Sequence, residues 1–179
     1  MGRNVEIKAR SLDFEAQARI AGSLGNGSVE DLVQEDTFFN VPAGRLKLRV
    51  FENGSGELIQ YQRKGSSGPR ECRYARSPVS DPASLKEVLT EALGVRAVVR
   101  KRRRVYFRGQ TRIHLDQVEG LGTFIELEVV LEPNQEFARG VAIAEDLMSK
   151  LGIAREDLIS EAYVDLLTGP PKDNNISLL

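Results

Sequence analysis

Hydrophobic and charged residues alternate along the chain from 98 to 131, and the alternation is interrupted at 109–110 and at 119–122. A period of two is typical of strands, so this stretch predicts three consecutive antiparallel strands. Because successive side chains of a strand point to opposite faces, Lys101 and Arg103 share a face with apolar neighbours. Charged residues at such positions are unexpected in a sheet that packs on a hydrophobic core.

The two strands that follow sort their residues in the same way. If the apolar faces form the hydrophobic core, a second face gathers charged side chains, namely Lys101, Arg103, Arg112, Asp116, Glu126 and Glu128. A sheet with one solvated face is the simpler interpretation of any single strand. Repetition of the pattern elsewhere in the chain counts against that interpretation.

The N-terminal half repeats the pattern. Residues 4–10 place Glu6 and Lys8 opposite apolar residues, and residues 45–51 do the same for Lys47 and Arg49. Further strands are expected at 33–41, 57–63 and 70–76, joined by hairpin turns at 53–56 and 65–69. The faces of 57–63 are harder to assign, because Gln62 shares a side with Lys64 whereas Arg63 lies with Tyr61.

Helical spacing of apolar residues predicts four helices. The first is expected to start at a Ser11 cap and to end before Gly25, and the second to start at Asp81 and end at Gly94. A third starts at 133–134 and a short fourth covers 158–167. We therefore expect one α+β domain over 1–168, an antiparallel arrangement of about eight strands with helices, and a disordered tail at 169–179.

Composition narrows the classes of function. The 25 basic and 26 acidic residues nearly balance, which disfavours a protein that holds nucleic acid through overall charge. The basic run at 100–104 alternates between two strand faces, so a basic surface on Arg100, Arg102 and Arg104 is the weaker hypothesis. Cys72 is the sole cysteine, which excludes an internal disulfide. We find no signal peptide or membrane span and expect a cytoplasmic protein.

The shared charged face suggests a specific chemistry. If the sheet curls until this face lines a channel, its many bases require a polyanion, and a triphosphate is the simplest candidate. Glu126 and Glu128 are two apart on a strand, so their carboxylates stand about 7 Å apart and can flank Mg²⁺ or Mn²⁺. Glu6 adds a third oxygen ligand. His114, the sole histidine, is expected to be neutral rather than catalytic.

Five segments resemble the CYTH domains, also called triphosphate tunnel metalloenzymes, a family that includes class IV adenylyl cyclases and thiamine triphosphatases. They are VEIKAR at 5–10, RLKLRV at 45–50, KRR at 101–103, RIHLDQVEGLGTFIELE at 112–128 and AYVDLL at 162–167. The central block is most similar to the class IV cyclase branch. The resemblance implies a closed antiparallel β-barrel, or tunnel, with helices packed outside it.

The resemblance also implies roles for individual residues. Metal ligands would be Glu6, Glu126 and Glu128, with Asp116 nearby, and catalytic roles would fall to Lys8, Arg112 and Asp116. Triphosphate-binding residues would be Lys8, Arg10, Lys47, Arg49, Arg63, Arg70, Lys101, Arg103 and Arg112. The family motif opens Glu-x-Glu-x-Lys, and this chain has Asn4 in place of the first Glu. Arg63 and Arg70 stand in for a lysine expected after the first hairpin.

Three functions follow as alternatives. The first is a class IV adenylyl cyclase-like enzyme that converts ATP to cyclic AMP and pyrophosphate. The second is a triphosphate phosphohydrolase acting on tripolyphosphate or thiamine triphosphate. The third is a triphosphate-binding module that has lost turnover, and it is suggested by Asn4 in place of the family glutamate. A small-molecule triphosphate is the expected partner, and a homodimer is left open.

Overall fold

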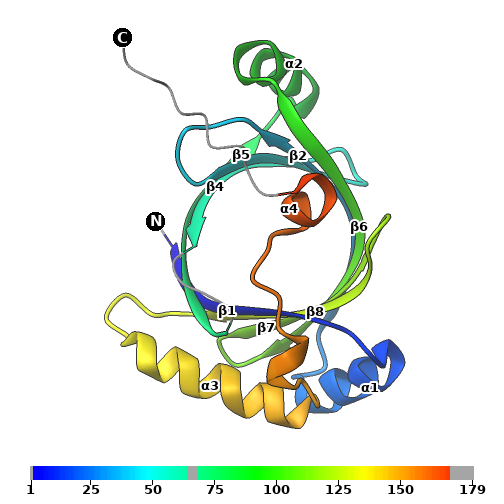
Figure 1. Ribbon diagram of the computed structural model, residues 1–179, viewed down its shortest axis with the longest axis vertical. Helices are drawn as coiled ribbons and strands as arrows, with labels where there is room; N and C mark the ends of the chain where they lie inside the picture. Colours follow the sequence, from blue (N-terminus) through cyan, green and yellow to red (C-terminus); the bar gives the residue numbers. More distant parts are fainter. Residues whose placement is uncertain (1, 64–67, 170–179) are drawn as a thin grey trace.

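The computed structural model describes residues 2–63 and 68–169, and in these ranges eight antiparallel strands close into a barrel (Figure 1). Around the barrel the strands follow the order β1, β5, β4, β3, β2, β6, β7, β8. Their bounds are β1 (Gly2–Arg10), β2 (Val29–Phe39), β3 (Arg45–Phe51), β4 (Gly56–Arg63), β5 (Arg70–Val79), β6 (Val95–Arg108), β7 (Thr111–Val118) and β8 (Gly122–Val130). The expected closed antiparallel barrel with outer helices is confirmed.

Closure depends on β1, which pairs with β5 on one side and β8 on the other. In this register Glu6 lies opposite Arg70 on β5 and opposite Glu128 on β8. Lys8 lies opposite Glu126. The first strand thus brings acids and bases from distant parts of the sequence together on the inner face.

The hydrophobic core lies outside the barrel, under the helices α1 (Phe14–Leu24) and α3 (Phe137–Lys150). The apolar faces of β1, β7 and β8 point outward, and Ile113 and Leu127 are fully buried against these helices. A Cβ added at Gly140 of α3 would lie 2.5 Å from a methyl carbon of Val5. A glycine there lets the helix approach β1 closely.

The short helix α4 (Tyr163–Thr168) lies within the outline of the ring, unlike α1, α2 (Pro82–Leu93) and α3, which lie outside it (Figure 1). Tyr163 and Val164 belong to an apolar cluster with Phe124 and other inward-facing residues of the strands. Asp165 accepts hydrogen bonds from Arg45 on β3 and Arg96 on β6. The helix α4 therefore closes one end of the barrel.

Several boundaries differ from the sequence-based expectation. The cap of α1 is Asp13, whose carboxylate accepts a hydrogen bond from the Ala16 backbone at 3.0 Å. Ser11 is not the cap, because its backbone pairs with Thr123 and its hydroxyl donates to Gln17. The Asp81 cap of α2 is confirmed.

The expected start of two other helices was also wrong. The helix α3 begins at 137 rather than at 133–134, after a turn in which Gln135 N–H donates to the Glu132 carbonyl. The last helix begins at Tyr163, not at 158, because Leu158 bridges to Ala9 and the Ile159 N–H donates to the Lys8 carbonyl. A 3₁₀ turn (Arg155–Asp157) precedes this extended stretch.

Two expectations concern segments outside the described residues. They are the tip of the turn at 65–67 and the tail at 170–179. In the part of the chain that the structure describes, none of the helices has the length and apolar content needed to cross a membrane.

Candidate active site

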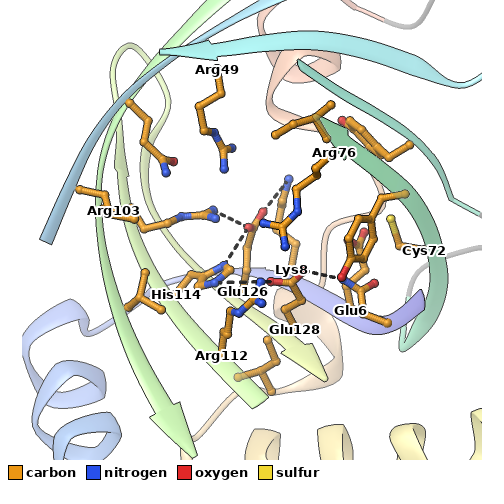
Figure 2. Close-up of a pocket in the computed structure, with 18 of the residues that line it drawn as sticks. Glu6, Lys8, Arg49, Cys72, Arg76, Arg103, Arg112, His114, Glu126 and Glu128 are labelled. Carbon is orange, nitrogen blue, oxygen red and sulfur yellow. Dashed lines mark hydrogen bonds and ion pairs between the residues drawn. The ribbon is translucent and has the colours of Figure 1, made fainter. Parts of the chain in front are cut away.

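The inner faces of the strands enclose a cavity of about 450 Å³ (Figure 2). Its lining includes Glu30 at the start of β2 and Arg76 near the end of β5, and both are exposed to solvent. The cavity therefore reaches the surface at the barrel end opposite α4, which we call the mouth. A cavity of this size suits a nucleotide-sized ligand.

Glu126 of β8 contacts two bases inside the cavity. It lies 3.1 Å from the Lys8 ammonium and accepts a 2.6 Å hydrogen bond from Arg103 (Figure 2). Burial by itself would raise the pKa of Glu126, but Lys8 and Arg103 hold it well below its usual range. Burial lowers the pKa of Lys8 to about 8, against the pull of Glu126. These charges stabilise one another in a poorly solvated space.

Glu128 lies two residues further along β8, toward the mouth. It accepts hydrogen bonds from the Asn4 amide at 2.6 Å and from Arg112 at 3.1 Å. His114 lies between the two glutamates, with its ring nitrogens 3.7 Å from Glu126 and 3.8 Å from Glu128. Burial is the main cause that lowers the pKa of His114, which agrees with the neutral imidazole expected from the sequence.

Glu6 of β1 faces the bases of the β4–β5 hairpin. Its carboxylate lies 2.6 Å from Arg63 as an ion pair and accepts a 3.2 Å hydrogen bond from Arg70. Arg63 lines the cavity, whereas Gln62 is exposed, and this settles the strand faces that the sequence left ambiguous. Arg70 also donates to the Ser160 carbonyl at 2.6 Å, so it links the site to the segment before α4.

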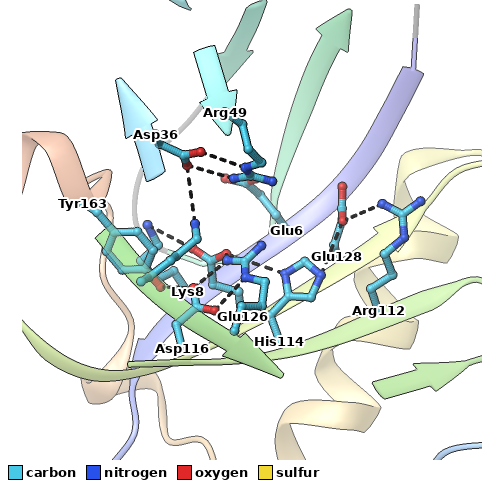
Figure 3. A network of polar contacts seen from close by, with 12 residues as sticks. Glu6, Lys8, Asp36, Arg49, Arg112, His114, Asp116, Glu126, Glu128 and Tyr163 are labelled. Atoms are coloured by element: carbon cyan, nitrogen blue, oxygen red, sulfur yellow. Dashed lines mark hydrogen bonds and ion pairs between the residues drawn. The ribbon is translucent and has the colours of Figure 1, made fainter. Parts of the chain in front are cut away.

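Asp36 of β2, which is not among the site residues predicted from the sequence, contacts three bases. It accepts two hydrogen bonds from Arg49, at 2.7 and 2.8 Å (Figure 3). It accepts another from Lys47 at 2.7 Å and lies 3.5 Å from the Lys101 ammonium. Burial would raise the pKa of Asp36, but Arg49, Lys47 and Lys101 hold it well below its usual range. The sequence feature that could have indicated Asp36 is its position inside the predicted strand 33–41, two residues before the apolar Phe38.

Asp116 is fully buried but is not among the residues that line the cavity. Arg103 binds it through two nitrogens, and the Tyr163 hydroxyl donates to it at 2.8 Å. The Tyr163 ring in turn lies 3.6 Å from the Lys8 ammonium. This geometry favours a positioning role for Asp116, which fixes Arg103, over the metal or catalytic role that the resemblance implied.

The other predicted site residues divide into three groups. Those that line the cavity are Glu6, Lys8, Lys47, Arg49, Arg63, Arg103, Arg112, Glu126 and Glu128. Arg70 and Lys101 lie behind this lining and contact Glu6 and Asp36. Arg10 is exposed at the end of β1, where its guanidinium lies 5.4 Å from the Phe124 ring. The structure therefore does not bring Arg10 into the cavity.

The sequence pattern of the CYTH domain matches residues 2–163. The chain belongs to the CYTH domain family. It is 27% identical over 167 residues to a protein of Aeromonas hydrophila named adenylate cyclase CyaB, and the match covers 89% of this chain and 85% of that protein.

Solved structures share the fold of this CYTH protein. The PH1012 protein of Pyrococcus horikoshii superposes with a TM-score of 0.80 and 27% identity, covering 91% of this chain and 98% of that one. A Hippeastrum protein studied as an adenylyl cyclase, and described as having a dominant triphosphatase activity, superposes with a TM-score of 0.68 and 18% identity. Coverage there is 97% of this chain and 98% of the other.

The CYTH family implies a divalent metal, and the residues of the cavity fit one. Among the described residues no group of three acidic, histidine or cysteine side chains is already arranged around one metal ion, and Glu6, Glu126 and Glu128 are each paired with a base. The carboxylates nevertheless supply the hard oxygen atoms that Mg²⁺ and Mn²⁺ prefer. The Asn4 Oδ1 atom, beside Glu128, is buried without a hydrogen-bond partner among these residues. An oxygen left unpaired in this way fits a cation ligand.

Proposed function

We propose that this CYTH protein is a metal-dependent enzyme that converts an organic triphosphate in the barrel cavity, most favourably ATP to cyclic AMP and pyrophosphate. One observation carries the proposal: bases from β1, β3, β4, β6 and β7 line the same buried space as Glu126 and Glu128. Such a concentration of paired charge in a cavity is costly to build unless a ligand uses it.

Glu6, Glu126 and Glu128, with the Asn4 carbonyl oxygen, would hold Mg²⁺ or Mn²⁺. When bound, such a cation supplies positive charge to the phosphate oxygens and lowers the barrier to displacement at phosphorus. Asn4 contributes a neutral oxygen where the family motif has a carboxylate, so the metal is held with one fewer negative charge.

The bases would bind the phosphates. Arg49 and Arg103 present planar guanidinium groups that suit pairs of phosphate oxygens, while Lys8 acts as a compact charge. In the structure these bases are bound by Asp36, Asp116 and Glu126. A triphosphate and a cation would exchange partners with these ion pairs, so that anion binds base and metal binds acid. Arg112 lies nearer the mouth beside Glu128 and would contact the phosphate closest to the organic group.

The choice of cyclase rests on the CyaB relative and on the block 112–128. A cyclase requires attack by the ribose 3′-hydroxyl on the α-phosphorus, whereas a triphosphatase requires attack by water on the terminal phosphorus. The triphosphatase described for the Hippeastrum protein makes hydrolysis the second candidate. Positioning and charge neutralisation account for most catalysis in both reactions.

The deciding experiment is a product assay. The protein is incubated with ATP, tripolyphosphate and thiamine triphosphate in Mg²⁺ or Mn²⁺, and the products are identified by chromatography and mass spectrometry. Cyclic AMP with pyrophosphate supports the cyclase, and orthophosphate supports the hydrolase. Binding without any product would replace the enzyme by a triphosphate-binding module, and absence of binding would refute the proposal.

Three further properties belong to the same proposal. The barrel and the family match both fall within 1–168, which we take as one domain. A cytoplasmic location agrees with the ATP substrate and with a single, buried cysteine. Light scattering after gel filtration tests whether the protein forms a homodimer.

A further inference from the structure

One part of the cavity wall is formed by uncharged, apolar side chains. Leu32 of β2, Phe51 of β3, and Val105 and Phe107 of β6 all line the cavity. These strands are neighbours in the barrel. On β2, Gln34 pairs with Phe51 of β3, and Glu30 pairs with Val105 of β6. Diagonal neighbours on adjacent strands are within reach of large side chains. The four residues therefore form one continuous surface, which we call the apolar patch.

The apolar patch lies between the phosphate-binding bases and the mouth. Arg49 precedes Phe51 by two residues on β3, and Arg103 precedes Val105 by two residues on β6. Both strands run toward the mouth, so Phe51 and Val105 lie two residues, or about 7 Å, nearer the mouth than these bases. A triphosphate held by Arg49 and Arg103 (labelled in Figure 2) would direct its esterified end toward the patch.

Gln34 adds a polar group to the edge of this surface. The residue is only 3% exposed, lines the cavity and lies directly across from Phe51. The Oε1 atom has no hydrogen-bond partner among the described residues. A buried acceptor is costly to leave unpaired, so an N–H or O–H group of a ligand would be favoured at this position.

We propose that Gln34 and the apolar patch form the subsite for the organic group of the triphosphate. Apolar and aromatic side chains with one buried acceptor suit a flat heterocycle that carries a hydrogen-bond donor, as a nucleobase does. The subsite distinguishes a nucleoside triphosphate from inorganic tripolyphosphate, which has nothing to place there. This inference rests on the proposed function, because it takes the bases as the phosphate site.

The test compares two ligands that differ only in the organic group. Dissociation constants of ATP and of tripolyphosphate are measured by calorimetry in EDTA, where a metal-dependent reaction does not proceed. Phe51→Ala is expected to weaken ATP binding about tenfold, the scale of one base-stacking contact. Gln34→Leu is expected to weaken it by up to about tenfold, the scale of one hydrogen bond. Tripolyphosphate binding is expected to stay within about twofold of the wild type, which also shows that the variants are folded.

Val33→Ala is the matched control, because Val33 adjoins Gln34 on β2 but is 42% exposed on the outer face. It should leave both dissociation constants unchanged. Equal losses for the two ligands, or unchanged ATP binding in Phe51→Ala and Gln34→Leu, would overturn the subsite and leave the proposed function standing. If the wild-type protein binds neither ligand in EDTA and also neither ligand with Mg²⁺ present, the proposed function and the subsite are both refuted.

Discussion

Asp36 accepts two hydrogen bonds from the guanidinium of Arg49, at 2.7 and 2.8 Å, inside the barrel wall. The same carboxylate contacts Lys47 and Lys101. One acid thus holds three bases of the proposed phosphate site in place before any ligand arrives. Side chains ordered in advance lose less conformational freedom when they bind.

Asp36→Asn should therefore destabilise the protein and loosen the phosphate site. Removing one member of a buried ion network leaves uncompensated charge, and the expected loss in free energy of unfolding is about 3 kcal/mol. Urea unfolding measures it, and tripolyphosphate should restore part of the loss by supplying the missing negative charge.

Asp31→Asn is the control for that measurement, since Asp31 lies on the outer face of the same strand, 68% exposed, and pairs with Arg104. An exposed pair of this kind contributes at most about 1 kcal/mol. Equal effects of the two substitutions would contradict the role given to Asp36.

Glu126→Gln and Glu128→Gln should each abolish metal-dependent turnover while the protein stays folded. The amide keeps the shape of the side chain but removes the negative charge that binds a cation. We expect the rate of product formation to fall about a hundredfold or more, on the scale of losing one charge-stabilising group. Circular dichroism checks the fold.

Arg102→Ala provides the comparison for the two glutamate variants. Arg102 is exposed on the outer face of β6, between the inward-facing Lys101 and Arg103. The Arg102→Ala variant should retain wild-type activity. Equal rates in all three variants would remove Glu126 and Glu128 from the proposed site.

Lys101 gives the site a dependence on pH. Burial, reinforced by Arg103 and Arg49 and opposed by Asp36 and Asp116, lowers the pKa of Lys101 to about 8. Tripolyphosphate affinity should fall as the pH rises from 7 to 9.5, because Lys101 loses its charge. Lys101→Met should bind more weakly at pH 7 and vary less over this range, as measured by calorimetry.

The contribution of Lys101 to stability has the opposite sign. The pKa of Lys101 is about 8 in the folded protein and has its ordinary value of 10.5 in the unfolded chain. Between these two pH values, the unfolded chain keeps a proton on Lys101 that the folded protein has released. Folding stability from this group therefore rises with pH through that window. Urea unfolding of the wild type and Lys101→Met at pH 7.5 and 9.5 should show a larger rise in the wild type. A smaller rise would contradict the assignment.

Tyr163→Phe tests how α4 is attached to the site. The substitution removes the 2.8 Å hydrogen bond from the Tyr163 hydroxyl to Asp116. A lost hydrogen bond to a buried charged group should cost about 2 kcal/mol of unfolding free energy. Turnover should fall as well, because Asp116 positions Arg103. An unchanged urea midpoint would mean that α4 closes the barrel without this contact.

Strand periodicity predicted the barrel interior well. Glu126, Glu128, Lys8 and Arg103 were assigned to one face from alternation, and all four line the cavity. The prediction succeeded because the side-chain period of a strand is two, so one apolar face fixes the direction of every other side chain.

Strand periodicity does not predict the role of a residue when that role depends on a partner distant in the sequence. Asp36 gains its importance from bases on β3 and β6, and Asp116 is held behind the cavity wall by Arg103 and Tyr163. Strand parity specifies a face but not the depth along a tilted strand. Arg10 shows the same limit, since it shares the parity of Lys8 but lies beyond the end of the cavity.

Closure of one barrel end by α4 has a consequence for the order of events. In the part of the chain that the structure describes, α4 lies across the end opposite the mouth, so substrate would enter and products would leave through the mouth, where Glu30 and Arg76 are exposed. In a cyclase whose nucleobase rests beside Phe51, the cyclic nucleotide would occupy the outer position and depart first. Pyrophosphate, deeper among the arginines, would depart last and would compete directly with incoming ATP.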